Sequence, residues 1–309
     1  MRKIIALLSV LLMVGCSQQA VIDTTVPIKP FSHVLSGPEV AEELNVLYLR
    51  RFPNCNNSDA QPAFLCSGVS LRVTSRDKEN IYKVWDPSPT SQLSGGVSFS
   101  YLRSDTNFQR FAWDGTNGLI FYPTLAAPAG KIAVQYLCSY PVDAWGWSRN
   151  SPCGPYTDFP VESGPCQDTG VTTAEKWIEL WSRPSDLQNL RQCSFDVRAQ
   201  RENLAGPAFY QSVRAKGMLG ARGFGEQNEV VVKTWTAGQP DTLPLMAFFY
   251  VPGSPASALA DARYNQRDFY NTTRSHIIVP IIRLTLPATS TGAVDFSYQE
   301  DDQVISAQR

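Results

Sequence analysis

This chain has few histidines, almost no net charge and no long apolar run, and each of these shortages excludes a class of function. Only two histidines occur, His33 and His276, and no two cysteines are spaced as Cys-x-x-Cys, so we expect no metal site. The 27 Lys and Arg residues nearly balance the 28 Asp and Glu residues, and the net charge of -1 provides no basic surface for nucleic acid. No apolar run reaches the roughly 20 residues that span a bilayer.

The N-terminus has the pattern of an export signal. A basic start at Met1-Arg-Lys, a short apolar run over residues 4–14 and a small residue at Gly15 predict a signal peptide over residues 1–15. Because Gly15-Cys16 resembles the lipobox of bacterial lipoproteins, we expect Cys16 to be acylated, with membrane contact only through that lipid. The exported protein is then an outer-membrane lipoprotein, or a secreted protein if cleavage falls beyond Cys16. Residues 16–36 are polar and lack periodicity, which indicates a tether.

The cysteine count agrees with export. Seven cysteines occur, and six remain when Cys16 is set aside. An even number in an exported chain predicts three disulfides, although the sequence alone does not fix their connectivity. The short-loop pairs, Cys55 with Cys66 and Cys153 with Cys166, are our first expectation.

Apolar periodicity and turn residues predict a mixed set of helices and strands. We expect helices over residues 39–51, after Thr172-x-x-Glu175 as a capping box, and after Pro207, with a polar helix or turn over 261–270. We expect strands over residues 68–74, 97–103, 119–122, 131–138, 229–235, 245–251 and 277–286. Pro280 inside the last run favours an edge strand or a bulge. This pattern is typical of the α+β class.

Arg72 is the first residue with chemical potential. Strand alternation places Val69, Leu71 and Val73 on one face and Arg72 on the other. An arginine in that position can clamp a pyrophosphate through a bidentate contact. The alternative is a solvent-facing arginine on a half-exposed strand.

Two further pairs of polar residues have the two-residue spacing that shares one face of a strand. Ser98 and Ser100 follow two glycines, and hydroxyls at this spacing can orient a carboxylate without changing its charge. Gln227 and Glu229 follow a glycine-containing loop that ends near Phe224, and a carboxylate beside an amide suits chemistry at the anomeric carbon of a sugar. The alternatives are an ordinary serine-bearing strand and a surface loop that enters a strand.

Taken together, Arg72, Ser98-Phe-Ser100 and Gln227-x-Glu229 resemble the Arg / Ser-x-Ser / Gln-or-Glu-x-Glu signature of cholera-toxin-like mono-ADP-ribosyltransferases. Phe224 resembles the aromatic of the turn-turn loop in Rho-modifying exoenzymes. Over a longer span, from Phe64 to Ser297, the chain resembles the halovibrin family of exported bacterial ADP-ribosyltransferases and NAD glycohydrolases. The stretches that carry this likeness are Val84-Trp-Asp-Pro-Ser-Pro, Gly95-Gly-Val-Ser-Phe-Ser-Tyr-Leu-Arg, Ala126-Ala-Pro-Ala-Gly, Cys193-Ser-Phe-Asp-Val-Arg, Ala208-Phe-Tyr-Gln-Ser, Gln227-Asn-Glu and Gln266-Arg-Asp-Phe-Tyr.

The resemblance implies a single catalytic domain over residues 37–300, followed by a tail over 301–309. Its core would be a split antiparallel or mixed sheet with an N-terminal helix. The long separation of Ser100 from Gln227 requires a disulfide-bearing insertion, over about residues 104–220. The sequence departs from the usual Ser-Thr-Ser at Phe99, and Gln227 in place of Glu goes with acceptors other than arginine.

The resemblance also implies a mechanism in which NAD is the substrate and no metal takes part. Arg72 binds the diphosphate, Ser98 holds Glu229, and Glu229 stabilises the oxocarbenium character of the ribose as nicotinamide departs. Gln227 assists at the catalytic centre and Ser100 lines the NAD site, and Phe224 or Tyr270 covers it. Water or an unknown protein acceptor then takes the ADP-ribose.

Three other classes compete with this interpretation. A Ser/His/Asp triad would need His33 or His276, and neither has a Gly-x-Ser-x-Gly partner. A glycosidase would need two acids, but Glu226 and Glu229 face opposite sides of a strand. The non-enzyme alternative is an outer-membrane lipoprotein that binds glycan or protein through the aromatic-rich middle of the chain.

Overall fold

The computed structural model of the chain describes residues 30–50, 66–74, 96–131, 134–143, 153, 165–166, 168–182, 193–196, 213, 225, 227–233, 240–253 and 257–305. The helices within these ranges are α1 (Gly37–Leu49), α3 (Ala174–Trp181) and α7 (Ser257–Thr272), with short 3-10 turns η3 (Ala112–Asp114), η6 (Pro240–Thr242) and η7 (Glu300–Asp302). The strands are β1 (Val69–Val73), β2 (Val97–Leu102), β3 (Asn117–Phe121), β4 (Gln135–Tyr140), β5 (Phe195–Asp196), β6 (Glu229–Lys233), β7 (Leu245–Tyr250), β8 (Ile281–Thr285) and β9 (Asp295–Tyr298).

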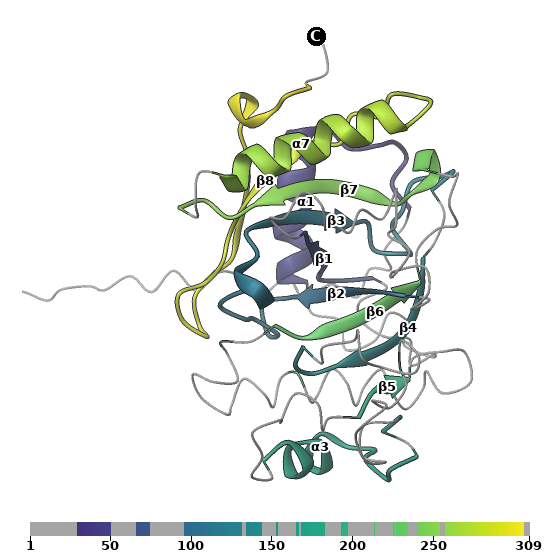
Figure 1. Cartoon of the computed structure of the whole chain (residues 1–309), viewed down its shortest axis with the longest axis vertical. Helices are drawn as coiled ribbons and strands as arrows, with labels where there is room; N and C mark the ends of the chain where they lie inside the picture. Colours follow the sequence, from purple (N-terminus) through teal and green to yellow (C-terminus); the bar gives the residue numbers. More distant parts are fainter. Residues whose placement is uncertain are drawn as a thin grey trace, which may run out of the picture.

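These strands form one mixed sheet in the order β5-β4-β6-β2-β1-β3-β7-β8-β9 (Figure 1). Every pair is antiparallel except β7 with β8, which are parallel and joined through α7. Helices packed on a mostly antiparallel mixed sheet belong to the α+β class, so the predicted fold class is confirmed. Within the described residues, no helix is long and apolar enough to cross a membrane.

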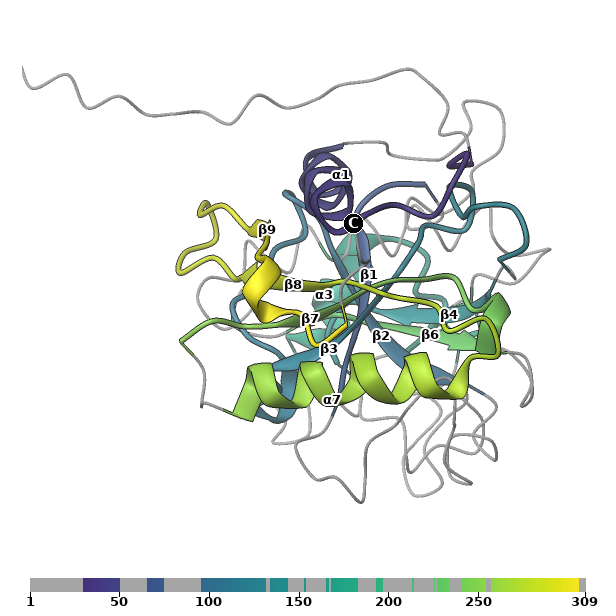
Figure 2. The ribbon, with the colours of Figure 1, turned by 90° about the horizontal axis from the view of Figure 1, so that it is seen from above.

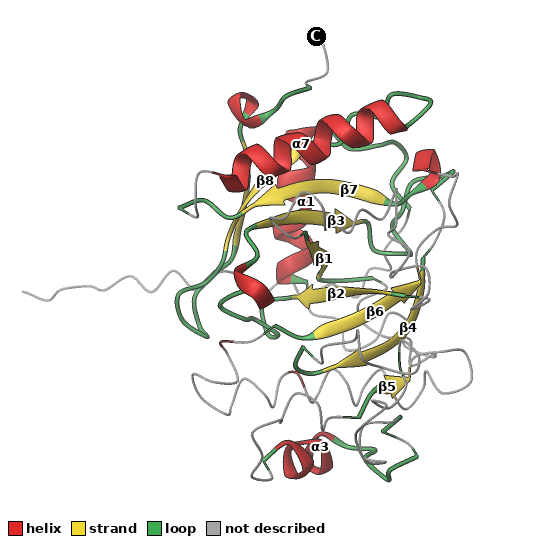
Figure 3. Ribbon diagram, viewed as in Figure 1, coloured by secondary structure: helices red, strands yellow, loops and turns green. Residues whose placement is uncertain are grey.

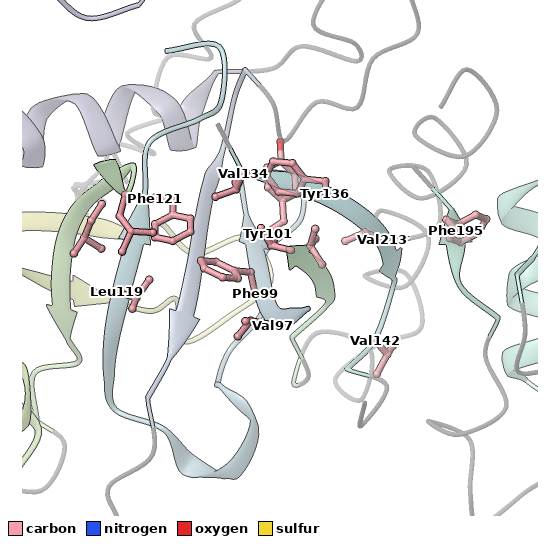
Figure 4. Close-up of a cluster of buried hydrophobic side chains, with 14 of the residues drawn as sticks. Val97, Phe99, Tyr101, Leu119, Phe121, Val134, Tyr136, Val142, Phe195 and Val213 are labelled. Atoms are coloured by element: carbon pink, nitrogen blue, oxygen red, sulfur yellow. The ribbon is translucent and has the colours of Figure 1, made fainter. Parts of the chain in front are cut away.

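Two helices cover opposite faces of the sheet, with α1 on one side and α7 on the other (Figure 2). The α1 face is filled by one apolar cluster that includes Leu44, Leu71 and Phe249. The α7 face is filled by a second cluster that includes Phe99 and Phe269, and Figure 4 shows part of it. Strands β3, β7 and β8 alternate between these two clusters, so the sheet is buried on both sides there. Val231 of β6 packs instead with Cys138 and Tyr140 of β4 in a third, smaller cluster.

Strand β2 pairs with a different neighbour over each half of its length. Its C-terminal half pairs with β1, from Leu71 opposite Ser100 to Val69 opposite Leu102. Its N-terminal half pairs with β6, from Val97 opposite Val232 to Phe99 opposite Val230. Figure 3 shows β2 between these two neighbours in the middle of the sheet. The pairing of β2 with β1 therefore ends at Ser100, and its pairing with β6 begins at Phe99, next to Ser98.

Most predicted elements that fall in the described ranges are present. The helix over 39–51 is α1, and the polar segment 261–270 is part of α7. The capping box at Thr172 is wrong by one residue, because Thr173 is the N-cap and accepts from the Lys176 amide. The helix predicted after Pro207 lies outside the described residues.

The prediction of an edge strand or bulge around Pro280 is also wrong. Pro280 precedes β8 rather than lying inside it, so the missing N–H removes no ladder bond from that strand. Its carbonyl accepts from the Phe248 amide at 2.9 Å, and β8 lies between β7 and β9. The short strands β5 and β9 are additions that the periodicity did not predict.

Two disulfides join Cys138 to Cys153 and Cys166 to Cys193. The expected pairing of Cys153 with Cys166 is therefore wrong. The physical reason is the sheet, because Cys138 lies on β4 and Cys193 lies just before β5, its neighbour. One bond joins Cys153 to β4, and the other joins Cys166 to the start of β5. Cys66 is also disulfide-bonded, and the partner expected for it lies outside the described residues.

The predicted insertion over residues 104–220 holds both of these disulfides and α3. The same segment supplies β3 and β4, which are part of the main sheet. The predicted signal peptide and most of the predicted tether lie outside the described residues.

Candidate functional site

Glu229 and Ser98 meet on neighbouring strands. Glu229 begins β6 and is 1% exposed, and the three valines that follow it are buried on both faces of the sheet. Ser98 lies on β2 directly opposite Val231, so its side chain and that of Glu229 are diagonal neighbours on one face. The Ser98 Oγ donates a hydrogen bond of 2.5 Å to Glu229 Oε1. The chain thus brings a buried carboxylate and a hydroxyl together from positions 131 residues apart.

Arg72 contacts the same serine through the main chain. Its Nη1 donates to the Ser98 carbonyl oxygen at 2.7 Å. The β1–β2 ladder has ended one residue earlier, at Leu71, so the guanidinium takes the place of a ladder bond where the strands separate. Arg72 is 8% exposed, which excludes the alternative of a solvent-facing arginine. Ser98 therefore joins Arg72, through its carbonyl, to Glu229, through its hydroxyl.

The alternation predicted for β1 is present in the structure. Val69 and Leu71 pack in the α1-face cluster, whereas the Ser70 hydroxyl lies 3.3 Å from the Tyr136 hydroxyl in the α7-face layer. Arg72 shares the face of Ser70, so its side chain starts on the face opposite to Ser98 and reaches the main chain of β2. The guanidinium of Arg72 thus lies beside the main chain of the strand that carries Ser98.

Gln227 and Ser100 complete the sequence motifs. Ser100 is 3% exposed and lies two residues from Ser98 on β2. Gln227 precedes β6, so strand alternation does not fix the direction of its side chain. Its main-chain carbonyl accepts from the Asp143 amide at 2.9 Å, and its buried Oε1 has no hydrogen-bond partner among the described residues. An amide oxygen in this state is available to a ligand.

The two aromatic candidates are not brought to Glu229 by any described contact. Phe224 lies outside the described residues. Tyr270 is half-buried near the C-terminus of α7, and its ring lies against the His276 ring with centroids 4.8 Å apart. Its carbonyl accepts from the Thr273 hydroxyl. These contacts join Tyr270, in the last turn of α7, to the segment that follows the helix.

Asn228 is a residue that no sequence motif singles out. It lies between Gln227 and Glu229 and is 0% exposed, and its side-chain amide bonds both main-chain groups of Tyr101. The only feature of the sequence that could have indicated its role is that asparagine is polar, because a polar side chain next to a buried strand must find hydrogen-bond partners.

The histidines do not build a triad. The His33 ring bonds Ser32 and Glu39 in an exposed cluster at the start of α1, where Glu39 also caps the helix by accepting from Ser36. His276 contacts Tyr270, as described above. In the described part of the chain, no group of three His, Cys, Asp or Glu residues is arranged to hold a metal ion. Glu226, the second acid of the glycosidase alternative, lies outside that part.

A cavity of about 410 Å³ lies elsewhere, around the ends of β3, β7 and β8. Its walls include Arg110, Phe111, Thr116, Val251 and Leu286. Neither Arg72, Ser98 nor Glu229 lines it, so we do not assign the candidate site to that cavity. The three hydrogen-bonded residues, rather than a hollow, define the candidate site.

Comparison of the chain with protein-family models finds no match, and comparison with curated proteins finds no significant match.

Proposed function

We propose that the protein cleaves the bond between nicotinamide and ribose in NAD, as an NAD glycohydrolase or a mono-ADP-ribosyltransferase. The observation that carries the proposal is the hydrogen bond from Ser98 to the buried Glu229, with Arg72 bonded to the same serine. These are the residues on which the sequence resembles ADP-ribosyltransferases, and they lie on three adjacent strands. Three short motifs far apart in the sequence would rarely meet in this way by coincidence.

The chemistry follows from the carboxylate. When the bond from the ribose C1′ to nicotinamide breaks, its electron pair leaves with nicotinamide, and the ribose gains oxocarbenium character. A carboxylate held in a buried place stabilises that positive charge, and it is worth more there than in water. The Ser98 hydroxyl keeps the Glu229 carboxylate oriented without neutralising it, because the serine donates the hydrogen.

The remaining candidates have supporting roles in this proposal. Arg72 fixes the main chain at Ser98 and supplies positive charge for the NAD diphosphate, since guanidinium groups suit phosphate oxygens. Gln227 offers its buried amide oxygen to the acceptor or to the ribose. Ser100 lines the NAD site, and Phe224 or Tyr270 covers it. Water attack at C1′ releases a proton and gives ADP-ribose, whereas a protein nucleophile gives a modified acceptor.

Export is part of the same proposal. A leader over residues 1–15 and a lipidated or free N-terminus would place the enzyme outside the cytoplasm, where disulfides persist. The two disulfides within the described residues agree with an oxidising environment.

The test is direct. The protein without residues 1–15, purified with its disulfides intact, is incubated with NAD, and the released nicotinamide is quantified by chromatography. Release with free ADP-ribose indicates the hydrolase, and release that grows on addition of protein acceptors that become labelled indicates the transferase. A folded protein that releases no nicotinamide under either condition would overturn the proposal and leave the non-enzymatic lipoprotein as the better account.

A further inference from the structure

Asn228 makes an unusual connection between the two strands of the candidate site. Its Nδ2 donates to the Tyr101 carbonyl at 2.7 Å, and its Oδ1 accepts from the Tyr101 amide at 2.8 Å. A residue in an antiparallel ladder exchanges the same two bonds with its partner through the main chain. The Asn228 side chain therefore substitutes for a main-chain pair between β2 and the segment that enters β6.

The position of this connection matters because the main-chain ladder stops short of Glu229. The last described pair between β2 and β6 is Phe99 opposite Val230. Glu229 is the next residue on β6, and Asn228 comes directly before it. On the other edge of this end of β6, Tyr140 of β4 pairs with Glu229. The bonds from Asn228 link this end of β6 to the main chain of β2.

Tyr101, the partner of Asn228, is itself fixed. It is 1% exposed, and its hydroxyl lies 3.3 Å from the Ser67 hydroxyl. Its ring fills the space beside Gly68, where an added Cβ would lie only 2.3 Å from the ring. Gly68 also has φ +68, a conformation that favours glycine. Asn228 thus links the chain before Glu229 to a residue that cannot easily shift.

We propose that Asn228 is a positioning residue that sets the distance between Ser98 and Glu229. The inference rests on the proposed function, in which Glu229 stabilises the transition state. Asn228 does not touch the reacting atoms. It acts by fixing the position of β6 along β2. A sliding of β6 by less than the length of one residue is enough to separate Ser98 Oγ from Glu229 Oε1, which are 2.5 Å apart.

The chain offers a matched control at the other end of the sheet. Asn45 on α1 makes the same two-way connection to Phe296 on β9, with Nδ2 donating at 2.8 Å and Oδ1 accepting at 3.2 Å. Strand β9 is the outermost strand on the side of the sheet away from β6. Asn45→Ala therefore removes an equivalent pair of bonds, together with one from Nδ2 to the Ala41 carbonyl at 2.9 Å, without touching the candidate site.

The experiment compares Asn228→Ala, Asn228→Asp and Asn45→Ala for nicotinamide release and thermal unfolding. Misplacement of a catalytic group by about 1 Å costs on the order of 100-fold, so we expect Asn228→Ala to lower kcat by about 10- to 100-fold with KM nearly unchanged. Asn228→Asp keeps the acceptor for the Tyr101 amide and is expected to lose less activity. Asn45→Ala should lower the unfolding temperature but leave kcat at the wild-type value.

Two kinetic outcomes overturn the proposal: wild-type kcat in folded Asn228→Ala and Asn228→Asp, or an equal loss of kcat in Asn45→Ala. Crystal structures of the same variants decide the matter independently of activity. Loss of the Ser98–Glu229 hydrogen bond in the Asn228 variants supports the positioning role, and its retention overturns it. If the wild-type protein releases no nicotinamide, the proposed function fails, and these distances still decide the role of Asn228.

Discussion

Removal of the Ser98 hydroxyl tests how the site holds its carboxylate. Ser98→Ala deletes the donor of the 2.5 Å bond to Glu229 and leaves the main-chain carbonyl that Arg72 contacts in place. The change therefore separates the side-chain contact of Ser98 from its main-chain contact. Because Glu229 is 1% exposed, solvent does not readily replace the lost donor.

The magnitude follows from the charge on the acceptor. A hydrogen bond to an ionised group contributes about 1.5–3 kcal/mol, and about 1.4 kcal/mol corresponds to a tenfold change in rate. If the bond orients Glu229 in the transition state, kcat for nicotinamide release should fall by about 10- to 150-fold. KM should change little, because NAD binding does not depend on this hydroxyl in the proposal.

The assay measures initial rates of nicotinamide release over a range of NAD concentrations. Ser194→Ala is a matched control, since Ser194 is also buried and its hydroxyl donates to the Cys153 carbonyl at 2.9 Å near β5. We expect Ser194→Ala to keep the wild-type kcat. An unchanged kcat in Ser98→Ala would refute the reasoning, as would an equal loss in the control.

Two further predictions concern Arg72 and the C-terminal ion pair. Arg72→Lys keeps the charge but loses the planar fork, so we expect KM for NAD to rise by about tenfold, and unchanged kinetics would remove Arg72 from the site. Burial opposes ionisation of Asp302, but hydrogen bonds from Arg283 and Tyr250 outweigh it and hold the pKa of the Asp302 carboxyl below its usual value. Because that pKa is lower in the folded state, the stabilisation is complete above the unfolded value of about 4 and is lost as pH falls through the folded value. Asp302→Asn should lower the unfolding temperature at pH 7 and flatten its decline in acid, and an unchanged acid limb would contradict this.

Local pattern predicted much of the sheet. Three consecutive valines after Glu229 indicate a strand buried on both faces, and β6 is such a strand. The two-residue spacing of Ser98 and Ser100 correctly places them on one face of β2. In both cases the signal lies within a few residues, where periodicity is informative.

Long-range pairing could not be predicted in this way. The meeting of Ser98 with Glu229 depends on the β2–β6 register, and register is set by packing across the whole sheet. The resemblance to ADP-ribosyltransferases implied that Ser98 holds Glu229, but the spacing within each motif says nothing about their contact. The disulfide of Cys138 with Cys153 has the same origin, because Cys138 lies on β4 and the fold around that strand decides which thiol is adjacent to it.

Asn228 illustrates a third limit. Its side chain forms a ladder-like pair with Tyr101, and a sequence pattern does not distinguish such an asparagine from one in a turn. Only the fold shows that its two partners are main-chain groups of the strand that carries Ser98.

The most direct test of the central claim is NAD cleavage by Glu229→Gln beside the wild-type protein. The change is nearly isosteric and keeps an acceptor for the Ser98 hydroxyl, so the fold and the unfolding temperature should be close to wild type. Loss of one electrostatic stabiliser of a transition state typically costs about 100-fold or more in rate, and we predict a loss of nicotinamide release of at least that size. Turnover by Glu229→Gln equal to that of the wild-type protein would contradict the account.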